Sequence, residues 1–186
     1  MERKATEPAF IVVMGVSGSG KSTIGAKLAV SLKWDYEDAD SFHPRANVEK
    51  MHAGHPLTDE DRWPWLEAIA AWMDEARRKA HQAVIGCSAL KRAYRQVLMD
   101  DHSDVRLVYL KGSREEIASR LALRHGHFMP ASLLDSQFGA LEEPGEEERP
   151  VVVSIEGTPQ DIVDRILAAL GMKDRRTERG SSVTRP

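Results

Sequence analysis

A glycine-rich stretch near the N-terminus has the residue types and the spacing of a phosphate-binding loop. Residues 15–22 read Gly-Val-Ser-Gly-Ser-Gly-Lys-Ser and match the pattern G-x-x-x-x-G-K-[ST] in full. The glycines permit a tight turn in which successive backbone N–H groups point at phosphate oxygens. Lys21 is expected to reach the outer phosphates, and the Ser22 hydroxyl is expected to ligate Mg²⁺. The stretch therefore predicts a nucleotide held by its phosphates; the alternative is a glycine-rich turn that matches by chance.

Two carboxylates could supply further parts of a phosphoryl-transfer site. Asp38 and Asp40 follow a short predicted strand, at the edge where open α/β sheets place their ligands. One could hold a metal-bound water, and the other could accept the proton of an attacking hydroxyl. Asp-x-Asp is also common in solvated turns, so the spacing alone leaves both interpretations open.

Basic residues follow later in the chain, and each group has a structural alternative. Arg120 and Arg124 are four apart, so they share a helix face that could stabilise transition-state charge or simply face solvent. Lys91, Arg92 and Arg95 follow the third predicted strand; they could bind an anionic or hydroxyl-rich substrate, or form an exposed helix start. His43 could be a hydrogen-bonding substrate contact or a structural residue. The glycine and proline in residues 125–130 mark a break between two helices, which suits a hinged lid and also any loop.

The elements that would position these residues alternate between apolar strands and amphipathic helices. We expect strands near residues 10–14, 34–38, 83–87, 105–110 and 151–155. Capping boxes or caps are predicted at Thr58–Asp61, Ser113–Glu116 and Thr158–Asp161, and a further helix is expected to start at Ser88. This alternation predicts an α/β fold, with a parallel sheet covered by helices on both faces.

Length and composition indicate one ordinary globular domain. The chain has 186 residues and a formal net charge of -3, which argues against a general nucleic-acid binder. Its single cysteine, Cys87, excludes an internal disulfide, and no apolar run reaches the length of a membrane span. We therefore expect a cytoplasmic protein with no membrane partner. Residues 1–8 should be a flexible lead-in, residues 9–171 a single domain and residues 172–186 a disordered tail.

Further runs of residues resemble the gluconokinases, a family of the phosphate-loop, nucleoside-monophosphate-kinase-like group. Two of these runs are the most specific: Asp-Ala-Asp-Ser-Phe-His-Pro-Arg-Ala-Asn-Val-Glu-Lys-Met at 38–51 and Cys-Ser-Ala-Leu-Lys at 87–91. The other matching runs are residues 15–22, 56–62, 64–66, 94–95, 109–112, 120–128, 136–138 and 141–144. The resemblance covers about residues 9 to 170. In one departure, Ala39 stands where relatives often have glycine.

The resemblance implies an activity and a detailed fold. The family phosphorylates D-gluconate on its terminal 6-hydroxyl with ATP and Mg²⁺, which gives 6-phosphogluconate and ADP. It implies a P-loop NTPase fold of the shikimate-kinase-like kind, with a five-stranded parallel sheet of order 2-3-1-4-5. It also implies a small lid over about residues 120–137 and assembly into a homodimer.

The resemblance also implies roles for individual residues. Asp40 would be the general base, Asp38 would lie with Ser22 near the metal, and Pro159 would lie near adenine. The residues that would meet the phosphates are Lys21, Arg120 and Arg124, with the phosphate-loop residues Gly15, Ser17, Gly18, Ser19, Gly20, Ser22 and Thr23. The substrate-side candidates beside Asp40 are His43, Arg62, Lys91, Arg95, His127 and Gln137, of which the basic ones would meet the gluconate carboxylate.

Two other functions share part of this pattern. A kinase for shikimate or for a nucleoside monophosphate would have the same fold and a different acceptor. A nucleotide-dependent regulatory protein would use the phosphate loop as a switch, although the basic residues after the third strand and the paired arginines speak against it.

Overall fold

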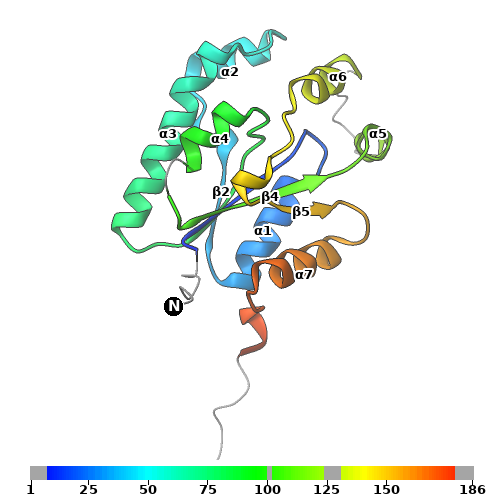
Figure 1. Ribbon diagram of the computed structural model, residues 1–186. Helices are drawn as coiled ribbons and strands as arrows, with labels where there is room; N and C mark the ends of the chain where they lie inside the picture. Colours follow the sequence, from blue (N-terminus) through cyan, green and yellow to red (C-terminus); the bar gives the residue numbers. More distant parts are fainter. Residues whose placement is uncertain (1–7, 100–101, 124–130, 179–186) are drawn as a thin grey trace, which may run out of the picture.

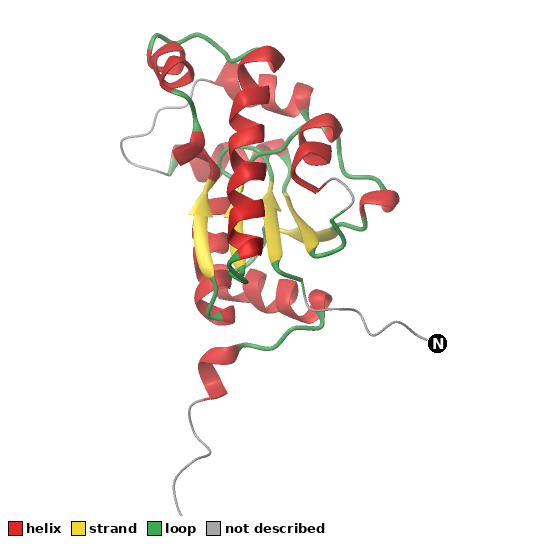
Figure 2. Cartoon of the chain, turned by 90° about the vertical axis from the view of Figure 1, so that its left-hand side faces the viewer, coloured by secondary structure: helices red, strands yellow, loops and turns green. Residues whose placement is uncertain are grey.

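A five-stranded parallel sheet forms the centre of the fold (Figures 1 and 2). The computed structural model describes residues 8–99, 102–123 and 131–178. The strands are β1 (Phe10–Met14), β2 (Asp35–Asp38), β3 (Ala83–Gly86), β4 (Val105–Lys111) and β5 (Val151–Ser154). Their order is β2-β3-β1-β4-β5, and every pair is parallel. Both the predicted α/β fold and the strand order implied by the resemblance are confirmed.

Helices cover both faces of the sheet, as Figure 1 shows. The α-helices are α1 (Lys21–Leu32), α2 (Arg45–His52), α3 (Asp59–Arg78), α4 (Arg92–Met99), α5 (Arg114–Ala122), α6 (Ala131–Ala140) and α7 (Pro159–Leu170). The short 3₁₀ helices are η1 (Ala39–Phe42), η2 (Glu146–Glu148) and η3 (Arg175–Glu178). Helices α1 and α7 pack on one face, and α3 and α4 pack on the other. No helix in the described ranges is long and apolar enough to cross a membrane.

Strand β1 lies in the middle of the sheet and is buried on both sides. Phe10, Val12 and Met14 pack with the apolar residues of α3 and α4. Ile11 and Val13 alternate with them and pack with α1 and α7. This explains why β1 reads as a continuous apolar run, because a parallel strand covered on both faces has no solvent side. The carboxyl end of this rigid strand carries the phosphate loop.

The three predicted caps fix where α3, α5 and α7 begin. Thr58, Ser113 and Thr158 each accept a hydrogen bond from the backbone N–H three residues later. The acidic residue at that third position accepts the N–H of the cap in return, so each is a complete capping box. The N-terminus of α3, which carries several candidate site residues, is therefore locally fixed.

The start of α4 differs from the expectation. A helix was expected from Ser88, but α4 begins at Arg92. Ala89 has a φ of 41°, in the left-handed region, which interrupts a right-handed helix. The carbonyls of Ala89 and Leu90 accept hydrogen bonds from the Arg95 guanidinium at 3.1 and 3.2 Å. The Arg95 side chain of α4 thus holds the segment between β3 and α4 in a non-helical conformation.

The last residues of the described chain lie against the domain. Met172 packs against the apolar cluster beneath α1 and α7, and its N–H donates to the Leu167 carbonyl. Helix η3 follows and lies beside α1. Of the segment predicted as a disordered tail, the structure describes residues 172–178.

Candidate active site

The phosphate loop connects β1 to α1 and has the backbone that its glycines allow. Gly15, Gly18 and Gly20 have φ values of 152°, 84° and 99°, a region that side-chain-bearing residues rarely adopt. A Cβ atom on Gly18 would lie 2.8 Å from the Cγ of Leu121 in α5, so glycine is also needed for space. Lys21 Nζ donates to the Val16 carbonyl at 3.1 Å, which folds its side chain back over the loop. This geometry places the loop N–H groups and the start of α1 as an anion site.

Asp38, at the end of β2, is bonded directly to the phosphate loop. Ser22 Oγ donates to Asp38 Oδ2 at 3.0 Å, and the Asp40 N–H donates to Asp38 Oδ1 at 3.1 Å. The Tyr36 hydroxyl lies 3.4 Å from the same Oδ2 atom. Burial of Tyr36 raises its pKa to about 12, so this hydroxyl keeps its proton and acts as a donor. Ser22 and Asp38 thus present two hard oxygen ligands side by side, which is the donor chemistry that Mg²⁺ prefers.

Asp40 projects from a backbone that the core holds in place. Its side chain is 89% exposed, whereas the preceding Ala39 is fully buried. The indole N–H of Trp65 in α3 donates to the Ala39 carbonyl at 2.7 Å. Ala39 is absent from the positive-φ residues of the described chain, so alanine is accommodated here without backbone strain. The exposed carboxylate of Asp40 therefore extends from a fixed backbone, two residues beyond Asp38.

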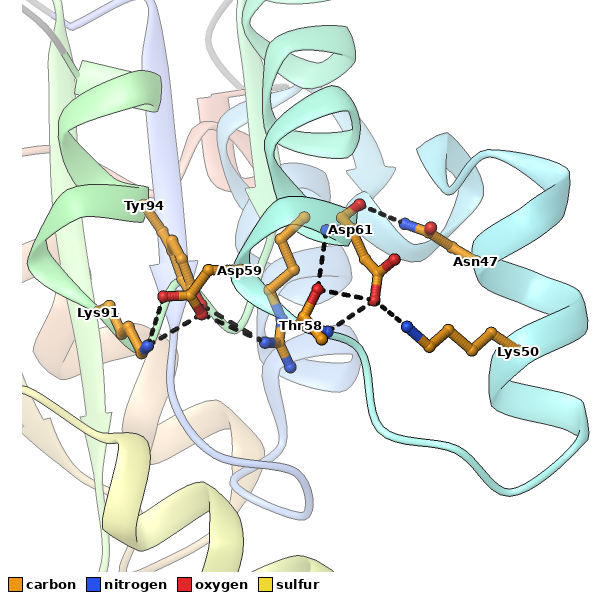
Figure 3. A network of polar contacts seen from close by, with 8 residues as sticks. Asn47, Lys50, Thr58, Asp59, Asp61, Lys91 and Tyr94 are labelled. Atoms are coloured by element: carbon orange, nitrogen blue, oxygen red, sulfur yellow. Dashed lines mark hydrogen bonds and ion pairs between the residues drawn. The ribbon is translucent and has the colours of Figure 1, made fainter.

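A polar network at the start of α3 gathers two of the basic candidates (Figure 3). Lys91 Nζ contacts both oxygens of Asp59, at 2.9 and 2.7 Å, and the Tyr94 hydroxyl donates to Asp59 Oδ1 at 2.5 Å. Arg62 Nη1 lies 3.4 Å from the Tyr94 hydroxyl and 3.9 Å from Asp59. The hydrogen bonds from Lys91 and Tyr94 lower the pKa of Asp59. With two cations against one carboxylate, the network has one positive charge left for an anionic ligand.

Sequence reasoning did not single out Asp59 and Tyr94 as site residues. Each lies within or beside a run that carries the family resemblance, at residues 56–62 and 94–95. The sequence could have indicated Asp59, because a carboxylate three residues before Arg62 in the first turn of a helix lies beside that arginine. The contact with Lys91 crosses 32 residues of chain and is visible only in the fold.

Arg95 is buried and paired with an acidic residue. Its side chain is 1% exposed and forms two bonds with the Glu148 carboxylate, at 2.5 and 2.8 Å. Its Nη1 also donates to the carbonyls of Ala89, Leu90 and Glu142. A guanidinium that is buried and bonded in this way has no donor directed at a substrate. The sequence expectation was that Arg95 contacts the substrate, whereas its burial and its bonds to Glu148 indicate a structural role.

Gln137 contacts the phosphate loop, and Arg120 contacts the backbone at the end of β5. Gln137 Oε1 in α6 accepts the backbone N–H of Ser17 in the phosphate loop at 2.6 Å, so it meets the loop rather than the acceptor side. The Arg120 guanidinium donates to the Ile155 carbonyl, just after β5. Pro159 is the first residue of α7, four residues beyond Ile155. Two further candidates, Arg124 and His127, lie outside the described residues.

The remaining candidates lie beside η1, in the phosphate loop and in the first turn of α1. His43 follows η1 and lies over the Trp65 indole, 3.9 Å from Asp40. Ser19 is fully buried within the loop, and Thr23 is exposed in the first turn of α1. Together these residues join a phosphate loop, a carboxylate pair and a cationic network at the carboxyl edge of a parallel sheet. This arrangement defines a phosphate-loop kinase acting on a small molecule.

Comparison with known proteins identifies the family. Residues 17–170 match the family model described as shikimate kinase. The gluconokinase of Gluconobacter oxydans is 46% identical over 168 residues, which cover 90% of this chain and 94% of that protein. The thermoresistant gluconokinase of Escherichia coli is 44% identical over 142 residues, with coverage of 76% and 81%. A crystal structure of a gluconokinase from Sinorhizobium meliloti superposes with a TM-score of 0.79 at 44% identity, over 88% of this chain and 92% of that one. The chain belongs to the gluconokinase family.

Proposed function

We propose that the protein transfers the γ-phosphoryl group of ATP to the 6-hydroxyl of D-gluconate, giving 6-phosphogluconate and ADP. The observation that carries the proposal is the 46% identity to a gluconokinase over 90% of the chain. The site geometry defines a kinase, and this relationship supplies the acceptor. No observation favours a shikimate kinase, a nucleoside monophosphate kinase or a nucleotide switch. The cytoplasm as its location and a homodimer as its assembly belong to the same proposal.

The phosphate loop and its neighbours would hold the nucleotide. The loop N–H groups and Lys21 would bind the β- and γ-phosphates, and Arg120 would approach from α5. The two oxygens of Ser22 and Asp38, 3.0 Å apart, fit Mg²⁺, which takes few protein ligands and keeps phosphate oxygens and waters as the others. When bound, Mg²⁺ neutralises charge on the phosphates. Arg124 remains a candidate for the phosphates on the family resemblance alone.

Asp40 would act as the general base. Its exposed carboxylate accepts the proton of the gluconate O6 as that oxygen attacks the γ-phosphorus. The bond from the γ-phosphorus to the β,γ-bridging oxygen breaks, and ADP leaves with that electron pair. The backbone bonds at Ala39 and Asp38 hold the base at the rim of the phosphate site.

The cationic network would recognise the carboxylate at the other end of gluconate. Arg62 and Lys91 are supplied by different elements and meet at Asp59, which holds Lys91 in one orientation. Charge-assisted hydrogen bonds from two cations suit a carboxylate ligand. His127 remains a candidate for the acceptor side on the family resemblance alone.

A coupled assay of ADP release tests this function. We expect turnover of the purified chain with ATP, Mg²⁺ and D-gluconate, formation of 6-phosphogluconate by ³¹P NMR, and no stimulation by shikimate or AMP. Asp40→Asn should lower kcat about 100- to 10,000-fold while ATP binding, measured by calorimetry, is retained. ADP release that is stimulated by shikimate or AMP but not by gluconate would refute the acceptor, and full turnover by Asp40→Asn would refute the base.

A further inference from the structure

We propose that His43 is a positioning residue for Asp40, fixed as an Nε2–H donor by Asn47 and held in plane by Trp65. The inference rests on the proposed function, because it assigns His43 a part in the step that Asp40 performs. It differs from the sequence expectation, in which His43 contacts the substrate. Four sets of contacts support it.

The first contact fixes the orientation of the Asn47 side chain. Asn47 in α2 is 5% exposed, and its Nδ2 lies 2.7 Å from the backbone carbonyl of Asp61. A carbonyl oxygen can only accept a hydrogen bond, so the amide group that faces it must be the NH₂. Figure 3 shows Asn47 directed from α2 toward Asp61 at the start of α3. Asn47 therefore has one orientation, with its nitrogen on the side of α3.

The same nitrogen then fixes the tautomer of His43. Asn47 Nδ2 lies 3.4 Å from His43 Nδ1 and carries a second hydrogen for it. Nδ1 must accept, so the ring proton of a neutral imidazole lies on Nε2. Burial lowers the pKa of His43, the Asp40 carboxylate opposes that shift and Arg62 adds to it. The imidazole is therefore neutral near pH 7 and has a single N–H, at Nε2.

That N–H faces the proposed base. His43 Nε2 lies 3.9 Å from Asp40 Oδ1, and the two side chains are 7% and 89% exposed. Asp40 is the exposed partner, so a rotation of its side chain would bring an oxygen within hydrogen-bonding distance of His43, whose side chain is enclosed. An N–H that engages one carboxylate oxygen leaves the other directed at the acceptor hydroxyl. His43 thus orients Asp40 without itself taking a proton.

Trp65 holds both members of this pair. Its indole stacks on the His43 ring, with centroids 4.4 Å apart and planes 13° from parallel. The indole N–H also donates to the Ala39 carbonyl, next to Asp40. A single buried ring therefore sets the plane of the histidine and the backbone of the aspartate. The link between α2 and α3 is reinforced by Lys50, which contacts Asp61 Oδ2 at 2.5 Å (Figure 3).

Two substitutions of His43 separate positioning from simple packing. A glutamine amide reaches about as far as Nε2 and can still donate to Asp40, whereas an asparagine amide stops near the place of Nδ1. We expect His43→Asn to lower kcat about 100-fold, with little change in the KM for ATP, because a misplaced catalytic group costs about that much. His43→Gln should recover most of this loss. His102→Asn, at a half-exposed histidine beyond α4, is the matched control and should leave kcat unchanged.

Two readouts can refute the inference, and the first uses only the wild-type protein, so it remains available even if a variant unfolds. In the wild-type protein, ¹⁵N NMR of the imidazole should show a neutral ring protonated at Nε2; a proton on Nδ1 would overturn the inference. A rise in the KM for gluconate with unchanged kcat in His43→Asn would overturn it as well, because that result marks a substrate contact. Wild-type turnover of gluconate, measured first, tests the proposed function separately. If another acceptor is used, the variants are compared with that acceptor.

Discussion

Removing the Arg95 side chain should destabilise the domain and leave substrate recognition nearly intact. The side chains of Arg95 and Glu148 are 1% and 10% exposed, so water screens their ion pair little. Arg95→Ala would leave the Glu148 carboxylate without its cation and would remove the guanidinium donor from the carbonyls of Ala89, Leu90 and Glu142. The Leu90 carbonyl would keep the backbone N–H of Glu142 as a donor. Breaking a buried pair from one side costs about 3–5 kcal/mol. For a domain of this size, that corresponds to a fall in Tm of about 6–20 °C.

The pH dependence of this loss follows from Glu148. Burial raises the pKa of Glu148, but hydrogen bonds from Arg95 and the Gly145 N–H outweigh burial and lower that pKa. A carboxyl group with a lowered folded pKa stabilises the protein above its unfolded pKa and loses this contribution as the pH falls. The difference between wild type and Arg95→Ala should therefore be largest near pH 7 and narrow in acid.

Thermal and urea unfolding at several pH values measure the loss of stability in Arg95→Ala. Steady-state kinetics well below Tm measure whether recognition of the substrate is retained. Arg92→Ala is the control, because Arg92 pairs with Glu147 on the surface, where both side chains are about half exposed. That pair should contribute about 0–1 kcal/mol. If Arg95→Ala had the same Tm and free energy of unfolding as the wild type but a much larger KM for gluconate, the structural role would be refuted. Arg95 would then belong to the acceptor site.

Three further predictions concern other parts of the chain. The hydrogen bonds from Lys50 and the Thr58 N–H lower the pKa of Asp61 from 3.8 to about 2. Unfolding measured from pH 5 to 2 should therefore show a larger acid loss of stability in the wild type than in Asp61→Asn, which keeps the losses of the other carboxylates. Gln137→Glu should raise the KM for ATP about tenfold or more and leave the KM for gluconate unchanged, because a carboxylate beside the Ser17 N–H repels phosphate. A raised KM for gluconate with an unchanged KM for ATP would contradict the placement of Gln137 beside the phosphate loop. Burial raises the pKa of Cys87 to about 12, so iodoacetamide should label it only after unfolding, as mass spectrometry would show.

The fold was predictable from local patterns. The apolar run of β1, the caps at Thr58, Ser113 and Thr158, and the glycines of the phosphate loop are each set by residues close in sequence. The start of α4 was not predictable, because it depends on Ala89 in a left-handed conformation and on the guanidinium of Arg95, which lies within α4 itself. Local propensity favoured a helix there, and a tertiary contact overrode it.

The site was predictable only in part. The spacing alone left Asp38 open between a site residue and a solvated turn, and its pairing with Ser22 was an expectation from the family resemblance. The structure brings the two residues together by a hydrogen bond at the same sheet edge. The burial of Arg95 depends on Glu148, 53 residues later, and the contact of Gln137 with Ser17 spans 120 residues. Sequence spacing shows which residue types are present, but it does not show which partner neutralises a charge. Asp59 was overlooked for the same reason, since its role lies in its contact with Lys91.

The position of β1 in the sheet has a consequence for biosynthesis. β1 leaves the ribosome before the other strands of this sheet, yet its two neighbours begin at Ala83 and Val105. A nascent chain must extend past Lys111 before β1 can pair on both sides, and to Ser154 before the edge strand β5 can join. Long-range pairing of this kind is slow, because the chain loses loop entropy before it gains contacts. Until β3 is synthesised, the apolar residues of β1 have no strand to pair with, and until β4 follows, one edge of β1 stays unpaired. Apolar strands that are exposed in this way during synthesis are prone to aggregate and are typical substrates of chaperones.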